Sequence, residues 1–115
     1  MKYIFPEDDK KYHWTSHVKR KMLHYGLSPS RVLRIIKHPK RIEKGIVPET
    51  LAVMQPTGTK QKPTEVWTMY AQKKNQKVII TAWRYPGISK VREEIPIPPD
   101  ILQELIREKI LKSLK

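Results

Sequence analysis

The sequence predicts an α+β domain in which two N-terminal helices pack on an antiparallel β-meander and a C-terminal helix follows. Three observations predict it. Apolar residues recur at helical spacing before position 38, apolar and polar residues alternate between positions 64 and 72, and an amphipathic stretch follows position 99. The 115 residues are enough for one core, so we interpret residues 1–115 as a single domain.

Two short helices are expected near the N-terminus. The first spans about Ser16–Tyr25, with Thr15 or Ser16 as its cap and Gly26 at its end. The second begins at Ser28-Pro29, where a capping serine precedes a proline, and it ends at His38-Pro39. Their apolar residues, expected to face the core, are Val18, Met22 and Tyr25 in the first helix and Val32, Leu33, Ile35 and Ile36 in the second.

Four strands are expected between the second helix and position 85. They are Arg41–Val47, Thr50–Gln55, Thr64–Gln72 and Lys77–Arg84, with a polar loop over Pro56–Pro63 and a turn over Lys73–Gln76. The last strand holds the most apolar run of the chain, Val78–Trp83. We therefore expect it to be central, antiparallel to Thr64–Gln72, with both helices on one face of the sheet.

The C-terminal extension, residues 86–115, continues an extended stretch that begins at Tyr85 and then forms a helix from about Pro99-Asp100. The apolar stripe of that helix could pack on the sheet or on a partner, and it consists of Leu102, Leu105, Ile106, Ile110 and Leu114.

The chain is strongly basic, with 24 Lys and Arg against 11 Asp and Glu and a net charge of +13. The charge is concentrated in residues 10–92, where 19 Lys and Arg face only three acids. Such a surface attracts phosphate backbones, which predicts a nucleic-acid partner. The alternative is a solvated lysine surface that aids solubility. The residues expected to contact nucleic acid are Lys19, Arg20, Lys21, Arg31, Arg34, Lys37, Lys73 and Lys74.

The chain has no cysteine, which excludes disulfides and thiolate catalysis and favours a reducing compartment such as the cytoplasm. The N-terminal residues lack the apolar region of a secretory signal, and no apolar run could span a bilayer. We therefore expect no membrane partner.

Three residues of the first helix form a polar stripe that could carry chemistry. His17, Lys21 and His24 fall at i, i+4 and i+7, with Arg20 beside them. Histidines could transfer a proton beside a phosphate that lysine holds, as RNA cleavage without metal requires. Alternatively, His17 caps or packs locally and the other residues form a solvated face.

A metal site is not expected. His13 and His17 have the spacing of two ligands on one helix face, but no acid accompanies them and lysines surround them. We accordingly predict no metal and no cofactor.

Several short motifs together resemble a family. They are His17, Lys21-Met22, Tyr25-Gly26-Leu27-Ser28 and the late Val78-Ile79-Ile80-Thr81 strand. They resemble small bacterial domains that open "His…Arg-Met…Arg-Gly-Ile-Ser" and close on a "Val-Ile-Thr" strand. Those domains are in turn similar to the RelE- and BrnT-type toxins, compact metal-independent ribonucleases. The resemblance covers about residues 14–85, and it departs from the pattern at Lys21 and Tyr25, where the family has arginine.

The resemblance implies an endoribonuclease of a toxin–antitoxin pair, with RNA as substrate and an acidic antitoxin-like protein as partner. It also implies that Arg84 and Tyr85, which follow the last strand, contact the scissile phosphate. In that enzyme, His17 and His24 of the polar stripe would transfer the protons. Alternatively, Arg84 is a strand-end charge and Tyr85 packs over Pro86. The competing function is a non-catalytic domain on the same fold that binds nucleic acid.

Overall fold

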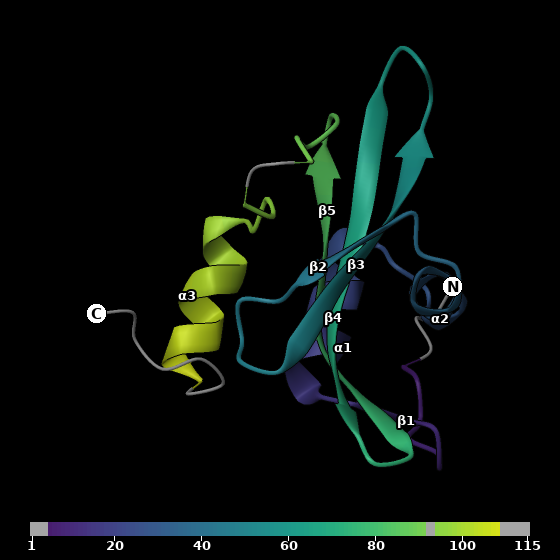
Figure 1. Ribbon diagram of the computed structural model, residues 1–115, viewed down its shortest axis with the longest axis vertical. Coiled ribbons are helices and arrows are strands. Elements are labelled where there is room, and N and C mark those ends of the chain that lie inside the picture. The colour runs from purple at the N-terminus through teal and green to yellow at the C-terminus, as the bar shows by residue number, and fades with distance from the viewer. Residues whose placement is uncertain (1–4, 92–93, 109–115) are drawn as a thin grey trace.

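The chain forms a five-stranded mixed sheet and three helices in residues 5–91 and 94–108, the part that the computed structural model describes (Figure 1). The elements are β1 (Tyr12–Trp14), α1 (Ser16–Tyr25), α2 (Pro29–Lys37), β2 (Arg41–Lys44), β3 (Thr50–Gly58), β4 (Pro63–Lys73), β5 (Gln76–Pro86) and α3 (Pro99–Arg107). Within these residues, no helix has the length and apolar character that crossing a membrane requires. The α+β class is therefore as predicted.

The sheet is not the pure antiparallel meander that the sequence predicts. Its order is β1-β5-β4-β3-β2, and β1 pairs with β5 in parallel. The middle strand is therefore β4, not the strand at Lys77–Arg84. With three residues, β1 is too short to show an alternating sequence pattern. Neighbouring acids fix its backbone instead: Asp9 accepts hydrogen bonds from the amides of Lys11 and Tyr12, and Asp8 accepts one from the amide of Trp14.

The N-terminal helices begin and end where their capping residues predict. Thr15 accepts a hydrogen bond from the amide of Val18 at 3.2 Å, and Ser28 accepts one from Arg31 at 3.1 Å. Gly26 ends α1 in the left-handed conformation, with φ of 67°. The turn to α2 is thus short and fixed, which places both helices on the same face of the sheet.

Each face of the sheet carries its own core. On one face, apolar residues of α1 and α2 pack against β3, β4 and β5. On the other face, Trp67 and Trp83 stack with their ring centroids 5.9 Å apart, and Ile101 and Leu105 of α3 are fully buried beside them. Burial of these two side chains makes the C-terminal extension part of the fold.

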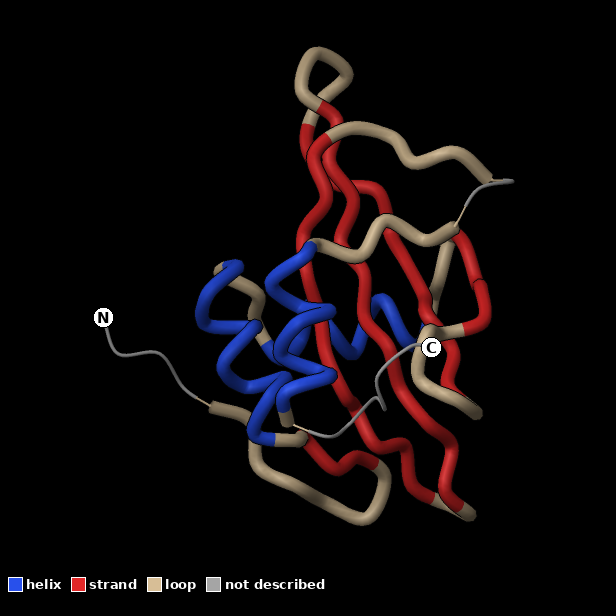
Figure 2. The backbone as a smooth tube through the Cα atoms, turned by 90° about the vertical axis from the view of Figure 1, so that its left-hand side faces the viewer, coloured by secondary structure: helices blue, strands red, loops and turns tan. Residues whose placement is uncertain are grey.

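The predicted stripe of α3 is only partly correct. Leu105 is buried, Leu102 and Ile106 are half-buried, and Ile101 lies in the core instead. Ile110 and Leu114 lie outside the described residues. Figure 2, turned so that the α3 side faces the viewer, shows α3 in front of the strands and α1 beside it, at the left edge of the sheet.

Candidate nucleic-acid interface

The polar stripe of α1 faces the C-terminal helix. Lys21 is 7% exposed, and its ammonium donates to Asp100 at 3.1 Å and also to Glu104. The Arg20 guanidinium donates to both carboxylate oxygens of Glu108 at 2.6 Å. The three acids are spaced i, i+4 and i+8, so they share one helix face. Lys21 binds the first two acids and Arg20 binds the third.

His17 is the most buried member of this cluster, with 1% of its surface exposed. Its Nε2 lies 2.9 Å from the Thr81 hydroxyl, and its Nδ1 lies 3.4 Å from Glu108. Burial lowers the pKa of His17 below its ordinary value of 6.5, although Glu108 opposes this shift. The imidazole therefore favours its neutral form and packs locally, which is the alternative role that the sequence left open.

The pKa values of the ion-paired groups shift toward the charged forms. Burial alone would lower the pKa of Lys21, but the hydrogen bonds to Glu104 and Asp100 outweigh it and raise the pKa. Burial alone would raise the pKa of Asp100, but the bond from Lys21 outweighs it and lowers the pKa. The bond from Arg20 lowers the pKa of Glu108. The cluster is thus a set of satisfied ion pairs between two helices.

This cluster also contains three side chains that could offer atoms to a metal. One ligand atom each of His17, Glu104 and Glu108 lies within 4.8 Å of the others. However, Arg20 and Lys21 already bind the two carboxylates, and their positive charges oppose a metal cation. We therefore interpret the group as an ion-pair network.

The other predicted catalytic residues gather at the C-terminal end of α1, around Tyr25. The exposed His24 ring lies edge-on to the Tyr25 ring at 4.7 Å, and Arg84 donates to the Tyr25 carbonyl at 3.4 Å. Arg84 and Tyr85 line an open hollow of about 350 Å³ together with Tyr25 and the proline-rich segment 96–99. His17 lies seven residues before His24, about 10 Å along the helix axis, and does not belong to this hollow.

Tyr25, at the centre of this group, acts as a hydrogen-bond donor. Its hydroxyl donates to Asp100 at 3.3 Å, and burial together with the Asp100 charge raises the pKa of Tyr25 to about 12. Tyr25 therefore stays protonated near neutral pH and helps to hold α3 against α1.

The cations of α2 differ from those of α1 in that the described part of the chain offers them no acidic partner. Arg31, Arg34 and Lys37, which we call the α2 basic edge, are exposed, as their i, i+3, i+6 spacing predicts. Lys40 follows and is exposed as well. Among the described residues, none of these four side chains forms an ion pair. Of the remaining predicted contacts, Lys73 and Lys74 are exposed at the β4–β5 turn and Lys19 is half-buried.

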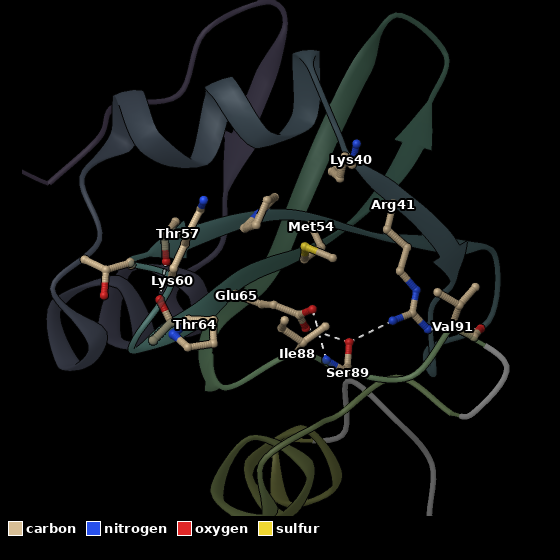
Figure 3. A pocket seen from close by; sticks show the side chains of 14 residues that line it. Lys40, Arg41, Met54, Thr57, Lys60, Thr64, Glu65, Ile88, Ser89 and Val91 are labelled. Carbon is tan, nitrogen blue, oxygen red and sulfur yellow. Dashed lines mark hydrogen bonds between the residues drawn. The ribbon is translucent and has the colours of Figure 1, made fainter.

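A cleft that the sequence does not predict lies on the α3 face of the sheet, between the β3–β4 hairpin and segment 87–91 (Figure 3). Its volume is about 780 Å³. Glu65, 2% exposed, accepts hydrogen bonds from the Ser89 hydroxyl at 2.6 Å and the Trp67 indole at 3.0 Å. Arg41 donates to the Ser89 hydroxyl at 2.7 Å and lies over the Trp67 ring.

These residues are distant in the chain, which explains why sequence patterns missed them. Glu65 and Ser89 meet only because β5 returns the chain beside β4. By contrast, the contact between α3 and α1 does have a signal in the sequence. Asp100, Glu104 and Glu108 repeat at the spacing of one helix face, which is complementary to the stripe of α1.

No family model, curated protein or solved structure matches the chain.

Proposed function

We propose that this domain binds RNA through the α2 basic edge. The observation that carries the proposal is the contrast in charge pairing: the cations of α2 are exposed and unpaired within the described residues, whereas Arg20 and Lys21 are neutralised by α3. Unpaired cations can release the counterions of a phosphate backbone, which supplies most of the affinity of such complexes. RNA, rather than DNA, is proposed because the chain resembles the RelE-type toxins.

Titration of a labelled single-stranded RNA tests this proposal. The test variant carries Arg31→Gln, Arg34→Gln and Lys37→Gln, and the matched control carries Lys11→Gln, Lys73→Gln and Lys74→Gln at the β4–β5 end. We expect the affinity of the test variant to fall at least about tenfold at low salt. The slope of its log affinity against log salt concentration should become shallower by about 2. Equal losses in both variants would instead indicate a diffuse basic surface.

We propose a metal-independent endoribonuclease as the second function. The observation that favours it is that Arg84 and Tyr85 line one hollow with Tyr25, whose ring the exposed His24 ring contacts. There His24 could transfer a proton, Arg84 could hold the scissile phosphate and Tyr85 could align it. The ion pairs with α3 argue against a direct role for His17 and Lys21, which the sequence also assigned to this chemistry.

Cleavage of labelled RNA, with and without chelator, tests this second function. We expect His24→Ala to slow cleavage by roughly 10²–10⁴-fold, and Arg84→Lys to be damaging because lysine lacks the forked donor. His38→Ala and Arg31→Lys are the matched controls outside the hollow. If the wild type does not cleave, the domain is a binding module only. If the wild type cleaves and His24→Ala cleaves equally well, the assignment of His24 is wrong.

A further inference from the structure

The cleft beside segment 87–91 has apolar walls and a buried polar floor. Met54 lines it from β3, and Ile88, which is 75% exposed, and Val91 line it from segment 87–91. Exposed apolar side chains beside a cavity of this size are typical of ligand sites, in which a few polar groups fix the orientation of a largely apolar ligand. The question is which ligand chemistry fits both the walls and the floor.

Among the described residues, one acceptor and one donor of the floor have no partner. Within that part of the chain, Glu65 Oε1 accepts from Trp67 and from the Ser89 hydroxyl, whereas Oε2 accepts only from the Ser89 amide at 3.1 Å. Arg41 uses Nε and both Nη2 hydrogens, and Nη1 donates one hydrogen, to Ser89. A carboxylate oxygen has two lone pairs and Nη1 has two hydrogens, so each group can form one more bond.

The rim of the cleft is positively charged and is continuous with the α2 basic edge. Lys40 and Lys60 both line the cleft, from different sides in Figure 3. The Lys40 amide donates to the Met54 carbonyl at 2.8 Å, and Gln55 donates to the His38 carbonyl at 2.7 Å. The end of α2 is therefore fixed to the strand that lines the cleft.

We propose that this cleft is a nucleobase subsite, which holds one unstacked base of a single-stranded RNA whose phosphates lie on Lys40 and Lys60. The proposal rests on the RNA binding proposed above. Sequence-dependent RNA recognition uses such splayed bases, held between side chains and hydrogen-bonded along their edges. A base edge presents a donor beside an acceptor, which matches Glu65 Oε2 and Arg41 Nη1.

An acidic peptide is the main competing occupant, because it too would be attracted by the lysines. The floor argues against it, since an acidic side chain that entered the cleft would meet the buried carboxylate of Glu65. A nucleotide avoids this conflict, because its charge stays on the phosphate at the rim and its base is neutral.

The first experiment follows the Trp67 indole N–H by NMR, because that group donates directly to Glu65. The probes are a nucleoside monophosphate and ribose phosphate, which share the sugar and phosphate but differ in the base. We expect the monophosphate to shift the Trp67 signal in a saturable way, and ribose phosphate to shift it little. Equal shifts from the two probes, or none from either, would overturn the base subsite.

The second experiment compares Ile88→Ser with Ile42→Ser. Ile42 is 57% exposed but lies on the opposite face of the sheet, so it is a matched loss of exposed apolar surface. We expect Ile88→Ser to weaken binding of a single-stranded RNA about fivefold to tenfold, near the lower end of what one held base contributes. The difference should vanish with an abasic strand of equal charge.

The outcomes separate the two proposals. If both serine variants bind RNA like the wild type while the α2 variant is weakened, the subsite is wrong and RNA binding stands. If the wild type does not bind RNA at low salt, both are wrong. If an acidic peptide shifts the Trp67 signal and the monophosphate does not, the cleft is a peptide site.

Discussion

The first two helices of this chain differ in what their cations contact. α1 carries Arg20 and Lys21, and both are ion-paired with acids of α3. α2 carries the α2 basic edge, whose side chains are exposed and form no ion pair within the described residues. The comparison teaches that a count of lysines and arginines does not locate a binding surface. The binding surface is found by asking which cations are ion-paired with acids of the same chain and which are not.

The largest expected effect comes from detaching α3. Leu105 is fully buried in the core on the α3 face of the sheet, so Leu105→Ala should lower the free energy of unfolding by about 2–5 kcal/mol. Denaturant unfolding measures this loss, with Ile88→Ala as an exposed control that should change it by less than about 0.5 kcal/mol. A small loss for Leu105→Ala would mean that α3 is not essential to the fold.

A smaller effect is expected from removing one paired cation. Lys21→Met leaves Asp100 and Glu104 without their partner, and should cost about 1–3 kcal/mol, less than for a fully buried pair because both acids reach water. Arg34→Met removes an exposed cation of α2 and should change stability by less than about 0.5 kcal/mol. Equal effects in the same unfolding assay would contradict the contrast between the helices.

Acid should weaken the α1–α3 contact. Burial lowers the pKa of His17 in the folded chain. Below pH 6.5 the unfolded chain therefore binds a proton at His17 more readily than the folded chain does. The free energy of unfolding consequently falls as the pH falls. Asp100 and Glu108 stabilise the fold above their ordinary pKa values of 3.8 and 4.5, and lose this effect as the pH falls through their lowered values.

Unfolding measured from neutral to acidic pH checks this direction. His17→Asn should flatten the profile just below pH 6.5. A wild-type profile that is flat, or that rises toward acid, would show that the buried histidine does not report on this contact.

The smallest expected effect concerns affinity. Glu108→Gln removes the charge that neutralises Arg20, so the freed guanidinium should strengthen RNA binding about twofold to threefold at low salt. Glu49→Gln removes an exposed acid that has no ion pair in the described residues and serves as the control. Identical gains in the two variants would mean that net charge alone, and not Arg20, sets the affinity.

Local patterns predicted the elements well and their assembly less well. The caps at Thr15, Gly26 and Ser28 fixed the helix boundaries, because capping depends on neighbouring residues alone. The parallel pairing of β1 and the meeting of Glu65 with Ser89 depend on contacts between distant segments, which no local period encodes.

The candidate site was predictable to a similar degree. The exposure of the α2 basic edge follows from helical spacing, and it was correctly expected. The stripe of His17, Lys21 and His24 was also visible, but spacing could not tell that His17 and Lys21 would be covered and His24 left exposed. That division depends on where α3 packs, which is decided by the burial of Ile101 and Leu105.

The position of β1 has a consequence for how the chain is made. Tyr12 pairs with Lys77, about 65 residues later, so the first strand has no place in the sheet until β5 has left the ribosome. At about 5–20 residues per second, synthesis imposes a wait of roughly 3–13 seconds. During this time the N-terminal segment can form its helices, whose contacts are local, but not its edge of the sheet. The first strand to be synthesised is therefore among the last that can find its partner.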